Sequence, residues 1–359
     1  MSILNRYIYR EFIRLFILVL FVFISIYLLV DFFEKIDNFL ETGLPYRVIG
    51  AYFIYKIPLI VKQMEPVAVL IGGALTIGLL ARNNELLAMK SLGRNLFLIC
   101  RPIFLSAFVF SGLLFVMQES LIPAMTSNTN FIWNVQVKRK QPKGFFGKDR
   151  FWFRGANAVY SINSFDAGRG KLQGVEIVIL EKDFSPKSIL YAREGRWIGG
   201  KWLFRNGWHK VLQPGGSYRM FPFHEKSMAL SEGPEDFREM TKSTDEMTSN
   251  ELSAYARKLE GQGQAARSCH IDLQARFAYI LMGPVLLLLG IPAFISRNIK
   301  SSMAVGISLG MLIAFVIWIT WDFSLTLGRT GVLPPWAAAW SPLIAASGFG
   351  AAGWRIIWQ

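Results

Sequence analysis

Six stretches of apolar residues, each close to the length of a membrane-spanning helix, constrain this chain more than any other feature of its sequence. A bilayer core about 30 Å thick requires roughly 20 apolar residues in helical form. The predicted spans are 15–33, 66–80, 96–117, 277–295, 303–327 and 336–354. Three precede a long polar segment and three follow it. This pattern predicts an α-helical membrane protein with a 3+3 arrangement and an inserted domain.

The second apolar run begins near Val48 and is too long for one straight span. Pro58 and Pro66 are predicted to break it, because proline removes a helical hydrogen-bond donor. Residues 66–80 then form the embedded half. The earlier half lies obliquely at the outer interface or inside the protein, and it carries Lys56, Lys62 and Glu65.

The composition also favours a membrane protein. The chain is 52% apolar and only 18% charged, whereas soluble proteins usually have about 25% charged residues. In so apolar a chain, the formal net charge of +14 fits an anionic membrane surface better than nucleic acid. The first apolar run is too long for the core of a cleavable signal peptide, and no small-residue cleavage site follows it, so it is predicted to be a retained span.

The charges of the short loops predict the orientation, because cytoplasmic loops carry an excess of Lys and Arg. One set of loops has mixed charges after the first span and only Arg329 after the fifth. The other set is basic and contains Arg6, Arg10, Arg14, Arg82, Lys90, Arg94, Arg101, Arg297, Lys300 and Arg355. Both termini are therefore expected in the cytoplasm and the inserted domain outside it. Cys100 and Cys269 then lie on opposite sides of the membrane and should not pair.

From about residue 128 to residue 243, apolar residues recur at every second position, which is the strand period. Segments 151–153 and 159–162 flank Gly155-Ala-Asn157, a hairpin pattern. Further strands are separated by turn residues at Gly199-Gly200, Asn206-Gly207 and Pro214-Gly-Gly216. Many short strands with regular turns predict an all-β domain of the sandwich or jelly-roll type.

The expected domains are residues 1–125 with spans one to three, a β-domain at 126–247, a connecting helix at 248–268, and residues 269–359 with spans four to six. The connecting helix begins with Thr248-Ser-Asn-Glu251, which fits a capping box. Its apolar face contains Leu252, Tyr255 and Leu259.

No motif for catalysis or metal binding stands out. The sequence has no Walker lysine loop, no HExxH, no nucleophile elbow and no CxxC. His209, His224 and His270 have no second ligand at helical spacing and are interpreted as surface or packing residues. We therefore expect neither a catalytic residue nor a metal site.

The loop between spans two and three, residues 81–93, is short and favours a helix. Its pattern consists of Asn83 or Asn84 as cap, Gly93 as stop, and Leu86, Met89 and Leu92 as an apolar stripe. Glu85 lies in the first turn, where the helix dipole favours a negative charge. The pattern fits either an amphipathic turn resting on the membrane or a coupling helix that inserts into a groove on a cytoplasmic motor.

Four segments, in chain order, carry a resemblance to a known family. They are RYIYRE at 6–11, ARNNELLAMKSLG at 81–93, FWFRGANAVY at 151–160 and GVLPPWAAAWSP at 331–342. They resemble the opening, the xSExxxMxxxG stretch, the first periplasmic hairpin and the start of the last helix of the LptF/LptG (YjgP/YjgQ) lipopolysaccharide-transport permeases. The last two segments favour the LptG branch. The resemblance covers essentially the whole chain, and the family shares its 3+3 layout.

The resemblance implies a permease subunit of an ATP-driven exporter in the inner membrane of a Gram-negative bacterium. Such a subunit would pair with a paralogous LptF-like permease over a dimeric LptB-like ATPase. The ATPase would bind ATP and Mg²⁺, and no cofactor is expected in this chain. The complex would extract lipopolysaccharide from the membrane and pass it through a β-jellyroll. Its further partners would be a single-span LptC-like protein and an LptA-like periplasmic bridge.

By position, Glu85 matches the family glutamate that pairs with an arginine of the ATPase, and Leu86 and Met89 would fill the surrounding groove. The expected coupling residues are thus Glu85, Leu86, Met89 and Arg82.

Lipid A offers acyl chains and negative phosphates, so its cavity needs an apolar wall and cations at headgroup depth. The candidate lipid-binding residues are Lys35, Lys56, Lys62, Arg47, Asp31, Phe32, Trp318, Trp321, Asp322 and Phe323. For any single aromatic residue, ordinary lipid-facing packing is the favoured interpretation, whereas Lys56 and Lys62 fit snorkelling to the interface as well as they fit phosphate binding. Ionisable residues within spans are functional hypotheses by default, which also singles out Glu65.

Asp31 departs from the family pattern, which often has a lysine at the outer end of span one. An acid there, with Glu34 close by, repels a phosphate unless it is paired with Lys35 or bridged by a divalent cation. The expected alternative is recognition of the lipid through Lys35, Lys56 or Lys62.

Two other classes of function stay open at this point. A mechanotransmission permease would relay ATP hydrolysis to a periplasmic partner without moving lipid, although such proteins usually have four spans with the soluble domain after the first. A membrane-bound enzyme acting on lipid is opposed by the lack of a nucleophile–base pair or metal cluster in the sequence.

Overall fold

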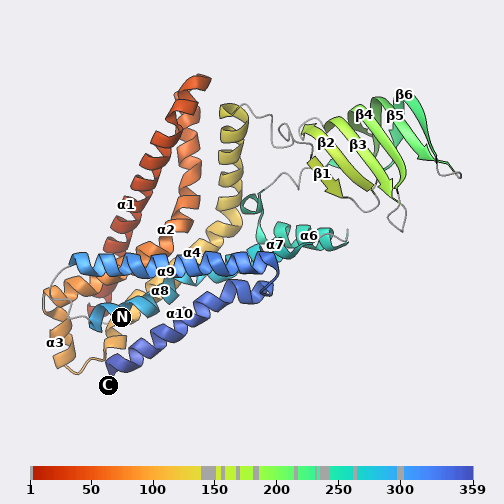
Figure 1. The fold of residues 1–359 in the computed structure, drawn as a ribbon. Coiled ribbons are helices and arrows are strands. Elements are labelled where there is room, and N and C mark those ends of the chain that lie inside the picture. The colour runs from red at the N-terminus through yellow and green to blue at the C-terminus, as the bar shows by residue number, and fades with distance from the viewer. Residues whose placement is uncertain are drawn as a thin grey trace. The chain divides into compact units, whose positions relative to one another are not determined.

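The computed structural model describes residues 3–138, 151–154, 158–166, 170–180, 186–213, 217–230, 233–234, 243–261, 265–296 and 303–358. The chain divides into two compact units. The helical unit comprises Met1–Ile36, Phe53–Met125 and Arg267–Gln359, and the sheet unit comprises Asp37–Tyr52 and Thr126–Ala266. Figure 1 shows the helices and strands that make up these units.

The first part of the chain forms long apolar helices. They are α1 (Ile3–Thr42), α2 (Tyr46–Arg82), the short α3 (Glu85–Ser91) and α4 (Leu96–Phe131), which continues into a π-helical turn, η1 (Ile132–Val137). Pro58 and Pro66 both lie inside α2, so the prediction that they break this run is wrong. Helices within membranes tolerate proline where neighbouring groups satisfy the freed carbonyls.

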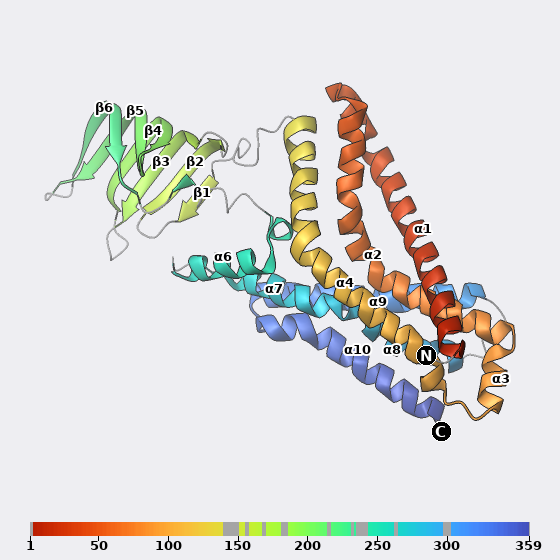
Figure 2. The same cartoon turned by 180° about the vertical axis from the view of Figure 1, so that it is seen from behind.

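The last part of the chain forms α7 (Arg267–Ile280), α8 (Met282–Ser296), α9 (Met303–Thr330) and α10 (Pro335–Trp358). The axes of α7 and α8 differ by 49°, and only Leu281 separates the two helices. Gly331, with φ of +98°, follows α9, and Pro335 opens α10, the position where proline costs no helical hydrogen bond. Figure 2 shows these helices from behind.

Among the described residues, four helices are long and apolar enough to cross a membrane, namely α1, α2, α4 with η1, and α9. The bent pair of α7 and α8 raises the number to five if it forms one broken span. α10 is rich in alanine, glycine and tryptophan, residues of modest hydropathy. The count of six spans therefore stays a prediction.

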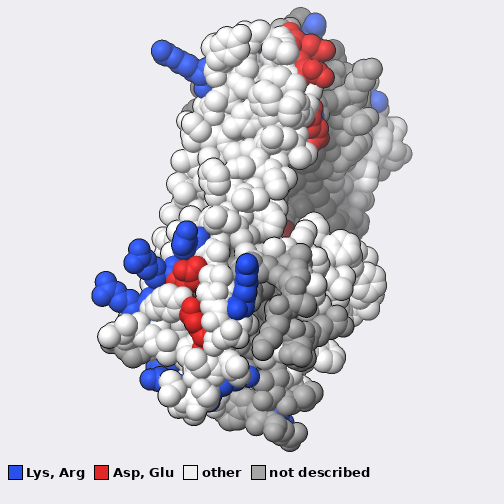
Figure 3. Space-filling view, turned by 90° about the vertical axis from the view of Figure 1, so that its left-hand side faces the viewer, with Lys and Arg blue, Asp and Glu red and all other residues white. Residues whose placement is uncertain are grey.

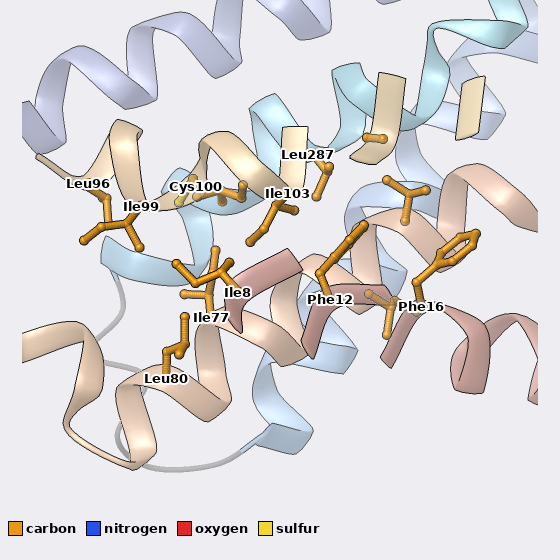
Figure 4. Packing of buried hydrophobic residues seen from close by; sticks show 14 of the residues in the cluster. Ile8, Phe12, Phe16, Ile77, Leu80, Leu96, Ile99, Cys100, Ile103 and Leu287 are labelled. Atoms are coloured by element: carbon orange, nitrogen blue, oxygen red, sulfur yellow. The ribbon is translucent and has the colours of Figure 1, made fainter. Parts of the chain in front are cut away.

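One of the two apolar clusters of the helical unit brings together α1, α2, α4 and α8, and the other joins α2, α7, α8, α9 and α10. Figure 4 shows side chains of the first cluster meeting. Its members include Ile8, Phe12 and Phe16 of α1, Ile77 and Leu80 of α2, Leu96, Ile99, Cys100 and Ile103 of α4, and Leu287 of α8. Cys100 and Cys269 are both buried free thiols.

Two glycines allow helices of this unit to approach closely. A Cβ on Gly72 of α2 would lie 3.2 Å from the Phe16 Cα of α1. A Cβ on Gly350 of α10 would lie 2.9 Å from the carbonyl carbon and oxygen of Leu288 in α8. Small residues are favoured at membrane helix contacts because they bring backbones together. Beside Gly350, the Trp354 indole donates to the same Leu288 carbonyl at 3.1 Å.

The sheet unit contains one antiparallel sheet whose six described strands follow the order of the chain. They are β1 (Phe151–Arg154), β2 (Ala158–Asp166), β3 (Lys171–Leu180), β4 (Pro186–Ile198), β5 (Lys201–Leu212) and β6 (Tyr218–Met228). Alternate side chains form its apolar face, including Tyr160, Ile162, Val175, Ile177, Leu190, Ala192, Trp202 and Phe204. The described strands form a meander, and the crossovers of a jelly roll are not among their connections.

The strand register tests the predicted turns. Arg154 pairs with Val159, and Ile198 pairs with Lys201, which confirms the first hairpin and the turn at Gly199-Gly200. Residues 155–157 and 214–216 themselves lie outside the described residues. Across the second of these gaps, the Gln213 N–H donates to the Ser217 carbonyl at 2.9 Å.

The prediction of a turn at Asn206-Gly207 is wrong, because both residues lie inside β5. Asn206 has φ of 55°, yet pairing continues on both sides of it, from Arg205 with Glu194 to Gly207 with Ala192. A Cβ on Gly207 would lie 1.9 Å from the Tyr191 carbonyl oxygen. The asparagine–glycine pair therefore distorts the strand locally without ending it.

The connecting helix α6 (Ser249–Gly261) follows a short 3-10 turn, η2 (Thr244–Glu246). The Thr248 N–H donates to Glu251 Oε2 at 2.9 Å, and the Glu251 N–H donates to Thr248 Oγ1 at 3.2 Å. The predicted capping box is thus confirmed. Leu252 and Leu259 are buried as expected, whereas Tyr255 is half-buried.

We expect Gly350→Ala to lower the free energy of unfolding by about 1–3 kcal/mol, the usual cost of overpacking, because its methyl group would meet the α8 backbone. Gly348→Ala on the same helix is the matched control, since a Cβ there meets nothing within 4 Å. Thermal unfolding of both variants in detergent measures the difference. Equal stability of the two variants would show that α10 does not pack this closely on α8.

Candidate functional site

The outer surface of α1 is uncharged over most of its length. Arg6, Arg10 and Arg14 are exposed, and no charged residue follows until Asp31. Figure 3 shows charged side chains gathered at the two ends of the visible face and an uncharged expanse between them. The exposed apolar side chains include Ile17, Leu18, Phe21, Val22, Ile26, Leu29 and Val30. This is the surface expected of a helix in contact with lipid hydrocarbon.

The short helix α3 is attached to the helical unit by polar and apolar contacts. Glu85 Oε1 accepts hydrogen bonds from the Tyr7 hydroxyl at 3.3 Å and from Asn83 Nδ2 at 3.2 Å. Leu86 and Met89 are only 8% and 7% exposed and belong to the same apolar cluster as Ile8 and Leu96, among others. The side chains on the outer side of α3 and next to it are Arg82, Leu87, Lys90 and Leu92, all of which are exposed.

The structure confirms that this loop is helical and refines how it is capped. Asn84 occupies the N-cap position in the left-handed conformation, with φ of 60°, and its side chain makes no capping hydrogen bond. Gly93, with φ of +77°, follows the helix as expected. Leu86 and Met89 do form an apolar stripe, but in this chain the stripe faces inward. Leu92 does not share it, since it is 82% exposed.

A buried cluster of charges joins α1 and α2. Asp31 is only 5% exposed, and its Oδ1 accepts hydrogen bonds from Lys35 Nζ at 2.5 Å and from Lys56 Nζ at 2.6 Å. Lys56 Nζ also lies 5.2 Å from the centre of the Tyr27 ring, a favourable cation–π distance. We call Asp31, Lys35 and Lys56 the charge cluster.

This geometry answers the concern that an acid at position 31 would repel phosphate. The single carboxylate is shared by two ammonium groups, so the charge cluster carries a net charge of about +1 with both lysines protonated. Asp31 therefore holds the two lysines side by side. The sequence raised the pairing of Asp31 with Lys35, but it did not indicate Lys56 as a second partner.

The other candidate lipid-binding residues lie on several elements. Phe32 is partly exposed and its ring contacts that of Phe53 at 5.7 Å. Trp318, Asp322 and Phe323 are exposed on α9, Lys62 is half-buried on α2, and Arg47 is an exposed residue of the sheet unit. Trp321 is the exception, because it is 4% exposed and packs inside the helical unit with its ring 6.2 Å from that of Tyr279. It does not contribute to the outer surface.

The chain thus combines a unit of long apolar helices, an inserted antiparallel sheet and the short amphipathic helix α3. The sequence model of the family described as "Lipopolysaccharide export system permease LptF/LptG" matches residues 6–358, nearly the whole chain. The chain belongs to the LptF/LptG family. A comparison with curated protein sequences returned no match.

Membership of the LptF/LptG family makes the chain a lipopolysaccharide export permease of the inner membrane, which works with ABC ATPase partners and is not itself an enzyme. The long apolar helices and the inserted β-domain agree with this assignment. Within this LptF/LptG protein, α3 and the charge cluster are the polar features of the helical unit that most need a functional explanation.

Two tyrosines of this permease were missed by the sequence analysis. Tyr27 precedes Asp31 by one helical turn, so its proximity to the charge cluster follows from i,i+4 spacing and was available in the sequence. Tyr7 is different, because it is separated from Glu85 by 78 positions. Its contact arises only when α1 packs beside α3, and no local pattern indicates it.

The histidine with the closest polar contact in the β-domain is His209. Lys226 Nζ lies 2.7 Å from His209 Nδ1. Burial first, and then the charge of Lys226, lower the pKa of the imidazole below its usual value, which keeps the ring neutral and able to accept this hydrogen bond at neutral pH. The described residues contain no group of three or more possible metal ligands.

We expect Asp31→Asn to lower the free energy of unfolding by about 3–5 kcal/mol, the usual cost of removing one partner of a buried ion pair. The reason is that Lys35 and Lys56 would lose their shared counter-charge. Adding Lys56→Met to Asp31→Asn should recover part of the loss, because one unpaired ammonium group is then removed. Thermal unfolding in detergent measures both effects.

Glu34→Gln is the matched control, since Glu34 is an exposed acid three positions along the same helix. We expect it to change stability by less than about 0.5 kcal/mol. Comparable losses in Asp31→Asn and Glu34→Gln would contradict a specific role for the buried carboxylate.

Proposed function

We propose that the chain is the LptG-type permease subunit of an ATP-driven exporter that extracts lipopolysaccharide from the inner membrane. The observation that supports this most strongly is the family match across residues 6–358. Segments 151–160 and 331–342 favour the LptG branch over LptF. The complete membrane part would have six spans with α10 as the sixth. Both termini would be cytoplasmic, and the sheet would be part of a periplasmic jelly roll.

The proposed assembly contains a second, LptF-like permease and a dimeric LptB-like ATPase that binds ATP and Mg²⁺. A single-span LptC-like protein and an LptA-like bridge would receive the lipid. This chain offers one short helix, α3, as a contact for the ATPase, whereas a dimeric ATPase has two equivalent contact sites. A second permease would occupy the other site.

The outer surface of α3 would contact the ATPase. Glu85 would pair with an arginine of that partner, exchanging its long hydrogen bond from Tyr7 for a charge-assisted one. Arg82, Leu87 and Lys90 are exposed next to it and complete the surface. Leu86 and Met89 would act differently from our expectation, because they anchor α3 to the helical unit and so would transmit its displacement to the spans.

The charge cluster would recognise the lipid headgroup. Lys35 and Lys56 offer two ammonium groups against the single carboxylate of Asp31, and the net positive charge suits a phosphate of lipid A. The exposed aromatic residues Phe32, Trp318 and Phe323 would contact acyl chains. The structure supports this role by bringing the two lysines together at 2.5 and 2.6 Å from one oxygen.

The lipid assignment separates the proposal from the alternative, a mechanotransmission permease that moves no lipid. We expect the chain purified in mild detergent to retain lipopolysaccharide, and retention to fall severalfold in Lys35→Gln/Lys56→Gln. Lys187→Gln/Lys201→Gln in the sheet unit is the control with the same loss of charge. Mass spectrometry of extracted lipid measures retention. Absence of lipopolysaccharide from the unaltered chain would favour the alternative.

We expect Glu85→Ala to weaken binding of the ATPase and to abolish transport in a reconstituted system, while insertion into the membrane stays normal. The lost interaction is a charge-assisted pair at an interface, whose removal typically costs about 2–5 kcal/mol of binding free energy. Pull-down of the ATPase and transfer of lipid to a periplasmic acceptor measure the two effects.

Tyr7→Phe and Glu34→Ala control this experiment. Tyr7→Phe removes only the hydrogen bond within the chain and should leave ATPase binding close to normal. Glu34→Ala removes an acid from the opposite end of α1. Normal transport by Glu85→Ala would refute the coupling assignment.

A further inference from the structure

One carboxyl group in the helical unit is buried without a hydrogen-bond partner in the part of the chain that the structure describes. Glu65 of α2 is 3% exposed, and neither of its carboxyl oxygens has a hydrogen-bond partner among the described residues. A Cβ on Gly283 would lie 3.4 Å from both oxygens. The carboxyl group therefore rests against the backbone of the first turn of α8.

Glu65 lies beside a proline of the continuous helix α2 and against α8, just after the bend that separates α8 from α7. Pro66, the next residue of α2, has no N–H, so the Lys62 carbonyl one turn earlier lacks its usual helical donor. Opposite it, α7 and α8 meet at a bend of 49°, across which the Leu281 N–H donates to the Ala278 carbonyl and the Val285 N–H donates to the Leu281 carbonyl. The Tyr279 hydroxyl of α7 joins this bend to α2 by donating to the Gln63 carbonyl at 3.2 Å.

Among the described residues, no cationic side chain is hydrogen-bonded to Glu65 to neutralise a carboxylate. α8 contains no ionisable residue. Tyr279 of α7 interacts electrostatically with Glu65 and with Asp322 of α9, and neither Tyr279 nor Asp322 can supply a positive charge. Lys62 precedes Glu65 on α2, and Arg276 precedes Tyr279 on α7, but neither donates a hydrogen bond to it.

An ionised carboxylate in such surroundings is costly. Transfer of an unpaired ion into an apolar interior costs many kcal/mol, and the group avoids this cost by becoming neutral. The positive end of the α8 dipole offsets only about 0.3–2 kcal/mol. The neutral carboxylic acid is therefore the form that this packing accommodates.

We propose that Glu65 is a proton-binding site: its carboxyl group holds a proton while α2 packs against the first turn of α8, and releases it when that contact opens to water. On opening, the Glu65 O–H bond breaks, a water molecule takes the proton as hydronium, and the carboxylate becomes solvated. Closing requires the reverse. Each opening and closing of this contact is thus linked to one proton.

The first test is infrared spectroscopy of the full chain in lipid nanodiscs. At neutral pH the unaltered chain should show the carbonyl band of a protonated carboxylic acid, and Glu65→Gln should lose it. Asp322→Asn is the matched control, because Asp322 is an exposed acid of the same neighbourhood, and it should keep the band. A band that persists in Glu65→Gln would overturn the proposal.

The same measurement distinguishes a proton from a metal cation. Adding sodium chloride at constant pH should leave the band unchanged, with choline chloride as the ionic-strength control. If sodium alone removed the band, Glu65 would be a cation site and the proposal would be wrong.

The second test is the pH dependence of stability. When a carboxyl group is kept neutral by the fold but ionises in the unfolded chain, the free energy of unfolding decreases as pH rises. The melting temperature of the unaltered chain should therefore fall relative to that of Glu65→Gln between about pH 5 and about pH 9. A constant difference across this range would contradict the proposal. Both tests use the isolated chain, so their outcome does not depend on lipid transport.

Discussion

The ion pairs of Asp31 with Lys35 and Lys56 show how the helical unit accommodates charge where a membrane supplies no water. A buried ion must be paired, neutral or displaced to an interface, and all three solutions occur. Asp31 shares one oxygen with two ammonium groups at 2.5 and 2.6 Å. Glu65 has no hydrogen-bond partner among the described residues and fits its surroundings only as a neutral acid. Arg6, Arg10 and Arg14 are exposed before the apolar part of α1 begins.

The same lack of water determines how the helices pack. Backbone groups are satisfied within each helix, so association depends on close contact more than on burial of apolar surface from water. A Cβ added at Gly72 would lie 3.2 Å from the α1 backbone, and one added at Gly350 would lie 2.9 Å from the α8 backbone. A bundle with such contacts tolerates little added volume at these positions, although the exposed faces of α1 and α9 accept most apolar side chains.

The sequence predicted those features that depend on local pattern. The apolar runs, the strand period and the Thr248–Glu251 capping box are each encoded within a few residues. The prediction that Pro58 and Pro66 break α2 was wrong, because tertiary contacts in the bundle support the helix through both prolines. The prediction of a turn at Asn206-Gly207 was wrong for a similar reason, since pairing of β5 with β4 on both sides of these residues outweighs a local turn preference. The link from Asp31 to Lys56, 25 positions apart, and the direction of Leu86 and Met89 depend on packing between helices, which local spacing does not specify.

The attachment of α3 bears on how a motor would act on this chain. Leu86 and Met89 are buried in one cluster with residues of α1, α2 and α4, and Glu85 accepts a hydrogen bond from Tyr7 of α1. A force applied to α3 would therefore reach three helices together, since close-packed interiors transmit displacement with little compression. Two of those helices, α1 and α2, also carry the charge cluster, and α2 carries Glu65. In the proposed exporter, a displacement of α3 by the ATPase would thus act on α1 and α2. These two helices hold Lys35 and Lys56, the proposed ligands of the lipid headgroup, and Glu65, the proposed proton-binding residue. No separate relay element would be needed.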